Sequence, residues 1–176
     1  MTVNSTPGNL AEEGKRLYGQ GQYDQAAVFF RRAAQSYALD HADLLAAEMN
    51  NNLSVALLQA GKAREALDAA LGTDQVFAAA ADRKRQAMAL GNQGAALEAL
   101  HRYDEALDVY GRSEVLFEQL GEGDLRALVK KSMAAIRLKR GDVLQSAITM
   151  VGSVEAKSKP SLFERFLKFL IRFKPW

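Results

Sequence analysis

The sequence predicts an all-α protein built from repeated helix pairs, and two observations lead to this fold class. All three prolines lie outside residues 9–155, a stretch rich in Ala, Leu, Glu and Gln, the residues that lose least on entering a helix. The second observation is a repeat. Similar turn-and-helix segments start 40 residues apart at Gly21, Gly61, His101 and Gly141.

Each repeat carries small residues at two fixed places. The first place holds Gly14, Ser54, Gly94 and Ala134, and the second holds Ala26, Ala66, Ala106 and Ser146. Small side chains at fixed offsets let two antiparallel helices approach closely, while large ones fill the gaps between turns. We therefore expect eight helices in four pairs, at about residues 9–20, 23–39, 42–60, 63–79, 81–100, 103–120, 124–140 and 142–155.

This pattern resembles the tetratricopeptide repeat (TPR) family. The matching residues are the small residues just named, a Leu three positions after each of the first three, the turn motifs GQYDQA and RYDEA, and the aromatic residues Phe30 and Tyr110. Two features depart from the family. The period is 40 rather than about 34, which implies longer helices or looser joints, and the fourth repeat is degenerate at Arg137 and Ser146.

The resemblance implies a right-handed α-solenoid of four TPR-like helix pairs, followed by a C-terminal amphipathic helix. The expected organisation is a flexible N-terminus (1–8), a TPR domain (9–155), a linker (156–160) and the amphipathic helix (161–174). The repeats are expected near residues 9–40, 41–80, 81–121 and 122–155.

The sequence gives no sign of catalysis. His41 and His101 belong to different repeats, no cysteine is present, and Gly121 and Gly123 lack the Lys-Ser/Thr that follows in a phosphate-binding loop. We therefore expect no enzyme, no metal site and no cofactor. Residues 1–155 carry a net charge of −3 with both signs mixed, so we also expect no nucleic-acid partner.

In TPR proteins the first helix of each repeat lines a concave groove that binds peptides. Carried over by position, the resemblance implies a peptide groove formed by Lys15, Tyr18, Asn51, Asn52, Leu58, Asn92, Lys131 and Ser132. Kinesin light chains and spindle-orientation adaptors, which this chain resembles more loosely, use groove asparagines to pair with the amides of an extended partner segment. Asn52 and Asn92 stand one repeat apart and fit such a ladder, because a carboxamide both donates and accepts. A solvated polar face is the alternative explanation.

The C-terminal segment SLFERFLKFLIRFKPW is predicted to be a capped amphipathic helix. Ser161 and Glu164 have capping-box spacing, and apolar side chains fill roughly 200° of the helix surface. With six basic residues and one acid from residue 156 onwards, the segment is also strongly cationic. The residues expected to dock are Phe163, Arg165, Phe166, Lys168, Phe169, Leu170, Arg172, Phe173 and Trp176.

Three surfaces could receive this helix. It could lie on an anionic membrane or another hydrophobic partner, cap the solenoid, or associate with a second copy of the chain. A helix of this length is too short to span a bilayer, and the N-terminus does not read as a signal peptide. The sequence therefore predicts a cytoplasmic adaptor, peripheral to a membrane in the first case, or a soluble homo-oligomeric scaffold in the alternative.

Overall fold

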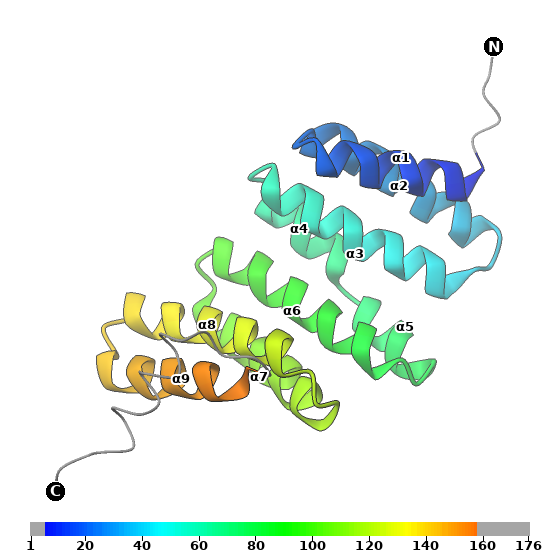
Figure 1. The fold of residues 1–176 in the computed structure, drawn as a ribbon. Helices are drawn as coiled ribbons and strands as arrows, with labels where there is room; N and C mark the ends of the chain where they lie inside the picture. The colour runs from blue at the N-terminus through cyan, green and yellow to red at the C-terminus, as the bar shows by residue number, and fades with distance from the viewer. Residues whose placement is uncertain (1–5, 158–176) are drawn as a thin grey trace, which may run out of the picture.

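The computed structural model describes residues 6–157, which form nine helices and no strands. In chain order these are α1 (Pro7–Gly19), α2 (Tyr23–Leu39), α3 (Asp43–Gln59), α4 (Ala63–Ala70), α5 (Thr73–Ala79), α6 (Arg83–Ala99), α7 (Tyr103–Gln119), α8 (Gly123–Lys139) and α9 (Val143–Ala156). Successive antiparallel pairs stack into an elongated α-solenoid (Figure 1). This confirms the predicted fold class.

The 40-residue period comes from long helices joined by tight turns. The helices α2, α3, α6, α7 and α8 are each 17 residues long. A left-handed residue stands at every twentieth position, namely Gly21, His41, Gly61, Ala81, His101, Gly121 and Gly141. Such a residue turns the chain at a helix end while the following amides bond back to the last carbonyls, as Gln22 N–H does to Leu17 O at 3.0 Å.

The small residues do bring the paired helices together. A methyl group at Gly14 would stand 2.8 Å from the ring of Phe30, and one at Gly94 would stand 2.6 Å from the ring of Tyr110. Contacts this short are sterically forbidden, so only glycine lets the aromatic ring of the second helix lie flat against the first. One continuous core runs from Leu10 to Ile136 along the stack.

The helix expected at residues 63–79 is wrong, because the chain breaks it into α4 and α5. Leu71 is extended and Gly72 is left-handed, with φ +80°. The carbonyl oxygen of Ala70, freed at the break, accepts from the Thr73 hydroxyl at 2.7 Å and from Gln93 Nε2 at 3.1 Å. Polar side chains from two helices thus compensate for the missing helical hydrogen bonds.

Both ends of the solenoid differ from the expected boundaries. The first helix begins at Pro7 rather than residue 9, because Thr6 caps it by accepting from Asn9 N–H at 3.3 Å and proline suits the first helical position. At the other end α9 stops at Ala156 and Lys157 is extended. The amphipathic helix predicted at 161–174 lies outside the described residues.

Candidate functional site

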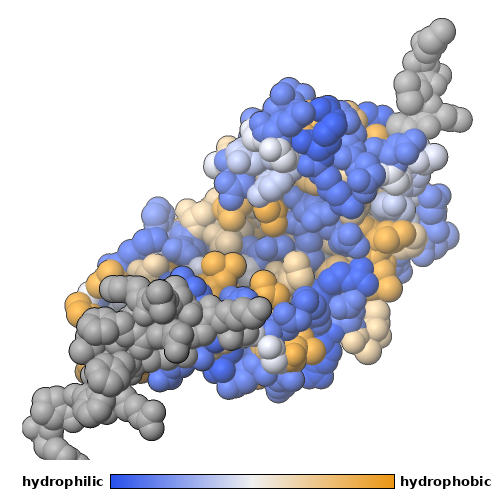
Figure 2. All heavy atoms as spheres, viewed as in Figure 1, coloured by the Kyte–Doolittle hydropathy of each residue, from blue (hydrophilic) through white to orange (hydrophobic). Residues whose placement is uncertain are grey.

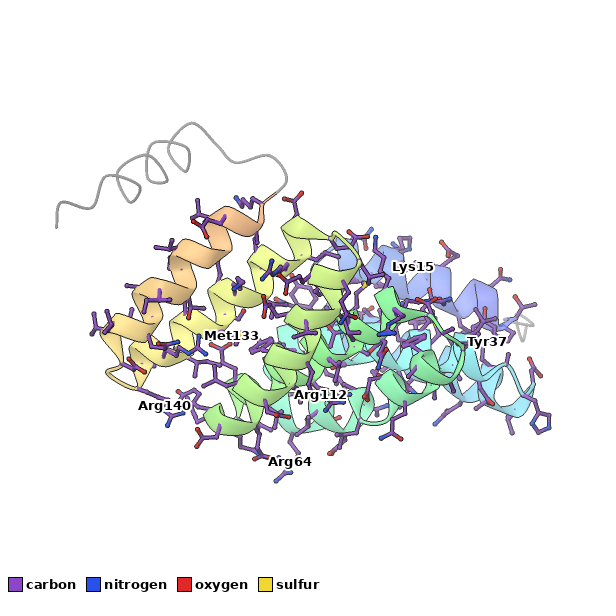
Figure 3. The ribbon with its side chains drawn as sticks, turned by 90° about the horizontal axis from the view of Figure 1, so that it is seen from below. Lys15, Tyr37, Arg64, Arg112, Met133 and Arg140 are labelled. Atoms are coloured by element: carbon purple, nitrogen blue, oxygen red, sulfur yellow. The ribbon has the colours of Figure 1, made fainter. Side chains whose placement is uncertain are left out.

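The first helices of the four pairs, α1, α3, α6 and α8, lie on one side of the stack, which we call the A face (Figure 1). Lys15 of α1 and Arg64 of α4 lie toward opposite edges of the molecule (Figure 3). The second helices α4 and α7 lie behind the first helices, whereas α9 lies beside α8 at the end of the stack (Figure 1). On the A face, hydrophobic patches lie over α6 and α8, whereas the surface over α1 and α2 is mostly hydrophilic (Figure 2).

A pocket of about 300 Å³ opens on the A face between α6 and α8. Two exposed apolar side chains belong to its lining, Met88 (45% exposed) and Leu128 (63% exposed). The second helix of the third repeat, α7, contributes Tyr110 and Phe117, both of which are buried. Asn92 and Ser132 add a carboxamide and a hydroxyl to the same wall. The pocket is thus apolar with polar groups that can orient a bound chain.

Tyr110 is the buried titratable group of this pocket. Burial raises the pKa of its phenol far above the ordinary value, Glu98 raises it further, and a hydrogen bond with Ser132 lowers it in part. The phenol is therefore neutral at any physiological pH. Its hydroxyl donates to Glu98 Oε2 at 3.4 Å, while Lys139 Nζ donates to Glu98 Oε1 at 2.9 Å.

The asparagines predicted to line the groove divide into two kinds. Asn51 is buried, and its Oδ1 accepts from the Thr73 hydroxyl at 3.2 Å and from Asn92 Nδ2 at 3.5 Å. It therefore ties α3 to α5 and α6. Asn52 and Asn92 are half-buried on neighbouring helices of the A face, one repeat apart, where a partner chain could reach them.

The remaining predicted groove residues do not gather in one place. Tyr18 packs on Tyr23 with ring centroids 5.3 Å apart, and Leu58 packs against the core. Lys15 is exposed at the far end of the solenoid and pairs with Glu12 at 2.9 Å. Lys131 is exposed on α8 next to Ser132. The structure thus brings Asn92 and Ser132 together in one pocket, with Lys131 beside them.

Sequence reasoning missed the apolar residues of the pocket. Met88 and Leu128 stand one repeat apart at the position where Glu48 lies in the second repeat. There Glu48 pairs with Arg85 at 3.1 Å, but the corresponding pair one repeat later is Met88 and Leu125, both in the pocket wall. An apolar residue at a position where the neighbouring repeat carries a charge is the sequence signal that could have located this pocket.

Within residues 6–157 no three or more His, Asp or Glu side chains are grouped so that they could hold a metal ion. None of the helices in this part of the chain is long and apolar enough to cross a membrane. Every buried polar side-chain atom of these residues has a hydrogen-bond partner.

Comparison with solved structures shows the TPR-like fold. The chain is similar to BtubC (BKLC) from P. vanneervenii, with a TM-score of 0.76 and 17% identity over 97% of this chain. It is also similar to a putative kinesin light chain with nearly identical TPR-like repeats from Podospora anserina, with a TM-score of 0.73 and 16% identity over 92% of this chain. The alignments span 66% and 80% of those two chains. The sequence matches no protein-family model and no curated protein.

Proposed function

We propose that this chain is a non-catalytic adaptor that binds an extended segment of a partner protein along the A face, with one apolar side chain of that segment in the pocket between α6 and α8. The observation that carries the proposal is that pocket. It combines exposed apolar walls with the carboxamide of Asn92 and the hydroxyl of Ser132, two groups that can hydrogen-bond a chain lying across it. The TPR-like fold supports a scaffold for protein interactions in general.

Two kinds of contact would act together in such a complex. The apolar side chain supplies most of the affinity, because burying a Leu or Phe contributes about 1.5–3 kcal/mol. The carboxamides of Asn52 and Asn92 can pair with backbone N–H and C=O groups, which exist at every residue of the partner. Backbone pairing selects an extended conformation, and the pocket then selects the register.

The test is a selection of unstructured peptides from a display library against the full-length chain, followed by affinity measurements on two variants. Leu128→Gln removes an apolar wall of the pocket, while Val115→Gln changes a comparably exposed apolar residue of α7 outside it (47% exposed). We expect selected peptides to share one large apolar residue and to bind Leu128→Gln at least about tenfold more weakly. Val115→Gln should bind like the parent chain.

Equal affinities for the parent chain and Leu128→Gln would refute the pocket as the binding site. Asn52→Ala together with Asn92→Ala tests the ladder separately. Affinity should fall while helicity, measured by circular dichroism, stays constant. If this double variant binds as tightly as the parent chain, the asparagines are only part of a solvated face.

The groove proposal does not depend on where residues 161–176 dock. For that segment the sequence leaves an anionic membrane surface, which would place a cytoplasmic adaptor at the inner face of a membrane. A homo-oligomeric scaffold in which this segment caps the solenoid or mediates self-association is the second candidate, and it is favoured by the apolar side chains that α9 exposes, such as Leu144 (73%) and Ile148 (55%). A mass that rises with concentration in light scattering would support assembly.

A further inference from the structure

The outer face of α9 is uncovered at two positions that the earlier repeats bury or half-bury. Counting back in steps of 40 from Met150, the equivalent residues Tyr110, Ala70 and Phe30 are all buried, whereas Met150 is 40% exposed. Counting back from Ala147, Leu67 and Ala27 are buried and Leu107 is half-buried, whereas Ala147 is exposed. Each earlier second helix is followed by another repeat that packs on it.

Ala147 and Met150 belong to one broad apolar surface, which we call the α9 face, and within it Leu144 and Ile148 stand where α7 carries the exposed Asp104 and Asp108. It consists of Val143, Leu144, Ala147, Ile148, Met150 and Val151. At 100° per residue these side chains occupy an arc of roughly 160°. Val143, Leu144 and Ile148 are each more than half exposed. Such a face is costly to leave in water, because each large side chain that becomes buried contributes about 1.5–3 kcal/mol.

We infer that the α9 face is the docking site of residues 161–174 of the same chain, which fold back as the first helix of a fifth repeat. This inference does not rest on the groove or its ligand. The 40-residue spacing of the solenoid continues into this segment, and this continuity identifies the segment as the occupant of the α9 face.

Three apolar residues of the segment, and Trp176 after it, fall at buried positions of the repeat, while Leu162, Phe163, Phe166 and Leu170 fall at half-buried ones. Forty residues before Leu167, Phe169, Phe173 and Trp176 stand Ala127, Val129, Met133 and Ile136, which are all buried in α8. Forty residues before the charged Glu164 and Lys168 stand Asp124 and Leu128, which are both exposed. Ile171 and Lys174 are exceptions, since Lys131 is exposed and Ala134 is buried. The pattern of apolar and charged residues in the segment therefore resembles that of the first helix of a repeat.

One contact between repeats changes its chemistry on both sides together. Between the third and fourth repeats, Glu114 of α7 pairs with Arg126 and Lys130 of α8 at 2.6 and 3.3 Å. The residues 40 positions later are Val154, Phe166 and Leu170. An acid facing two bases is thus replaced by three apolar residues. A paired replacement of this kind is expected where the same two helix positions meet again.

The chain can make the required turn. Four residues, 157–160, separate the end of α9 from Ser161, and Lys157 is already extended. At about 3.3 Å per extended residue they span roughly 13 Å, more than the 8–10 Å between the axes of packed helices. Ser161 stands 40 residues after the left-handed Gly121, and Pro160 disfavours any continuation of α9.

The docked helix would extend the A face by one element. Lys168 and Arg172 stand 40 residues after Leu128 and Ser132, so they would continue the two rows that line the pocket. Lys174 stands where the earlier repeats carry Gly14, Ser54, Gly94 and Ala134. A long side chain there leaves no close approach for a further helix, which fits a capping helix rather than a complete fifth repeat.

The test uses the rate at which a thiol on the α9 face reacts with a maleimide. The chain has no cysteine, so Ala147→Cys in the full-length protein introduces a single thiol at an exposed position. Its labelling is compared with that of the same variant carrying Phe169→Asp and Phe173→Asp, which give the helix two charges on its apolar side. Asp108→Cys, exposed on α7, provides a reference thiol in both backgrounds.

We expect the thiol at position 147 to react at least about tenfold more slowly in the full-length chain than in the chain with the two aspartates. The reference thiol should react equally in both. Equal rates at position 147 would overturn the inference. Protection that grows with protein concentration would assign the α9 face to a second copy and would overturn it as well. Rapid labelling at position 147 in a chain that floats with phosphatidylglycerol vesicles would also overturn the inference, because the helix would then bind the membrane rather than the α9 face.

Discussion

The close contact between Gly94 and Tyr110 makes Gly94→Ala the sharpest test of how these repeats pack. A methyl group at position 94 would stand 2.6, 2.7 and 2.9 Å from three ring atoms of Tyr110. Tyr110 is buried, with 4% of its surface exposed, so the ring has little room to move away. The matched control is Gly111→Ala, because a methyl group there meets nothing within 4 Å and the residue lies inside α7.

Both substitutions add one methyl group to a helical glycine, and they differ only in the room available for that methyl group. In a helix, Gly→Ala is worth about 1 kcal/mol in favour of folding. Overpacking a filled interior typically costs 1–3 kcal/mol. We therefore expect Gly111→Ala to stabilise the protein by about 0.5–1 kcal/mol and Gly94→Ala to destabilise it by about 1–2 kcal/mol. For a domain of this size the two melting temperatures should differ by roughly 5–10 °C.

The assay is thermal unfolding followed by circular dichroism at 222 nm, the usual helix signal, with urea unfolding as an independent measure. A double variant identifies the cause. Tyr110→Leu removes the ring atoms, so Gly94→Ala should cost at least about 1 kcal/mol less in that background. The reasoning is refuted if Gly94→Ala is as stable as Gly111→Ala, or if its cost is unchanged beside Tyr110→Leu.

Two further predictions concern a turn and an ion pair. Ala81 has a left-handed backbone, with φ 57°, so Ala81→Gly should raise the free energy of unfolding by about 0.5–1 kcal/mol in urea titrations, whereas Ala80→Gly, at a right-handed position, should lower it. Burial alone would raise the pKa of Glu114, but the hydrogen bond from Arg126 and the charges of Lys130 and Arg126 outweigh it and lower that pKa. Because the folded-state pKa is depressed, Glu114 stabilises the protein above its ordinary pKa of 4.5, and this contribution is lost as the pH falls below that value. Glu114→Gln should therefore lower the free energy of unfolding by about 1–2 kcal/mol at pH 7. The difference in unfolding free energy between this variant and the parent chain should become smaller as the pH is lowered, and a difference that does not change with pH would contradict this assignment.

The helix pairs, their period and the residues that let them pack could be predicted from the sequence, because these properties are local or strictly periodic. Gly14 and Gly94 recur at one repeat position, and the structure confirms that each receives an aromatic ring. The turns were predictable for a similar reason. A left-handed residue at a helix end favours glycine, and four of the seven such positions hold it.

The break after α4 could not be predicted from spacing, since the other second helices continue through the equivalent residues. Gly72 permits the break, but the partners that satisfy the freed carbonyl of Ala70 include Gln93, which lies 23 residues away. Likewise, Asn51 and Asn52 are adjacent in sequence and chemically identical. The structure alone shows that Asn51 is buried against Thr73 while Asn52 stays on the A face.

The sequence by itself determined that this protein is a stack of helix pairs, since helix propensity, small-residue spacing and turn residues act over short distances and recur at a fixed period. Only the tertiary structure decided which side chains line the pocket between α6 and α8. That pocket exists because Met88, Tyr110 and Leu128 come from three helices whose distance is set by the packing beneath them. The burial of any one side chain depends on what the rest of the fold places above it, and this information is spread over the whole chain.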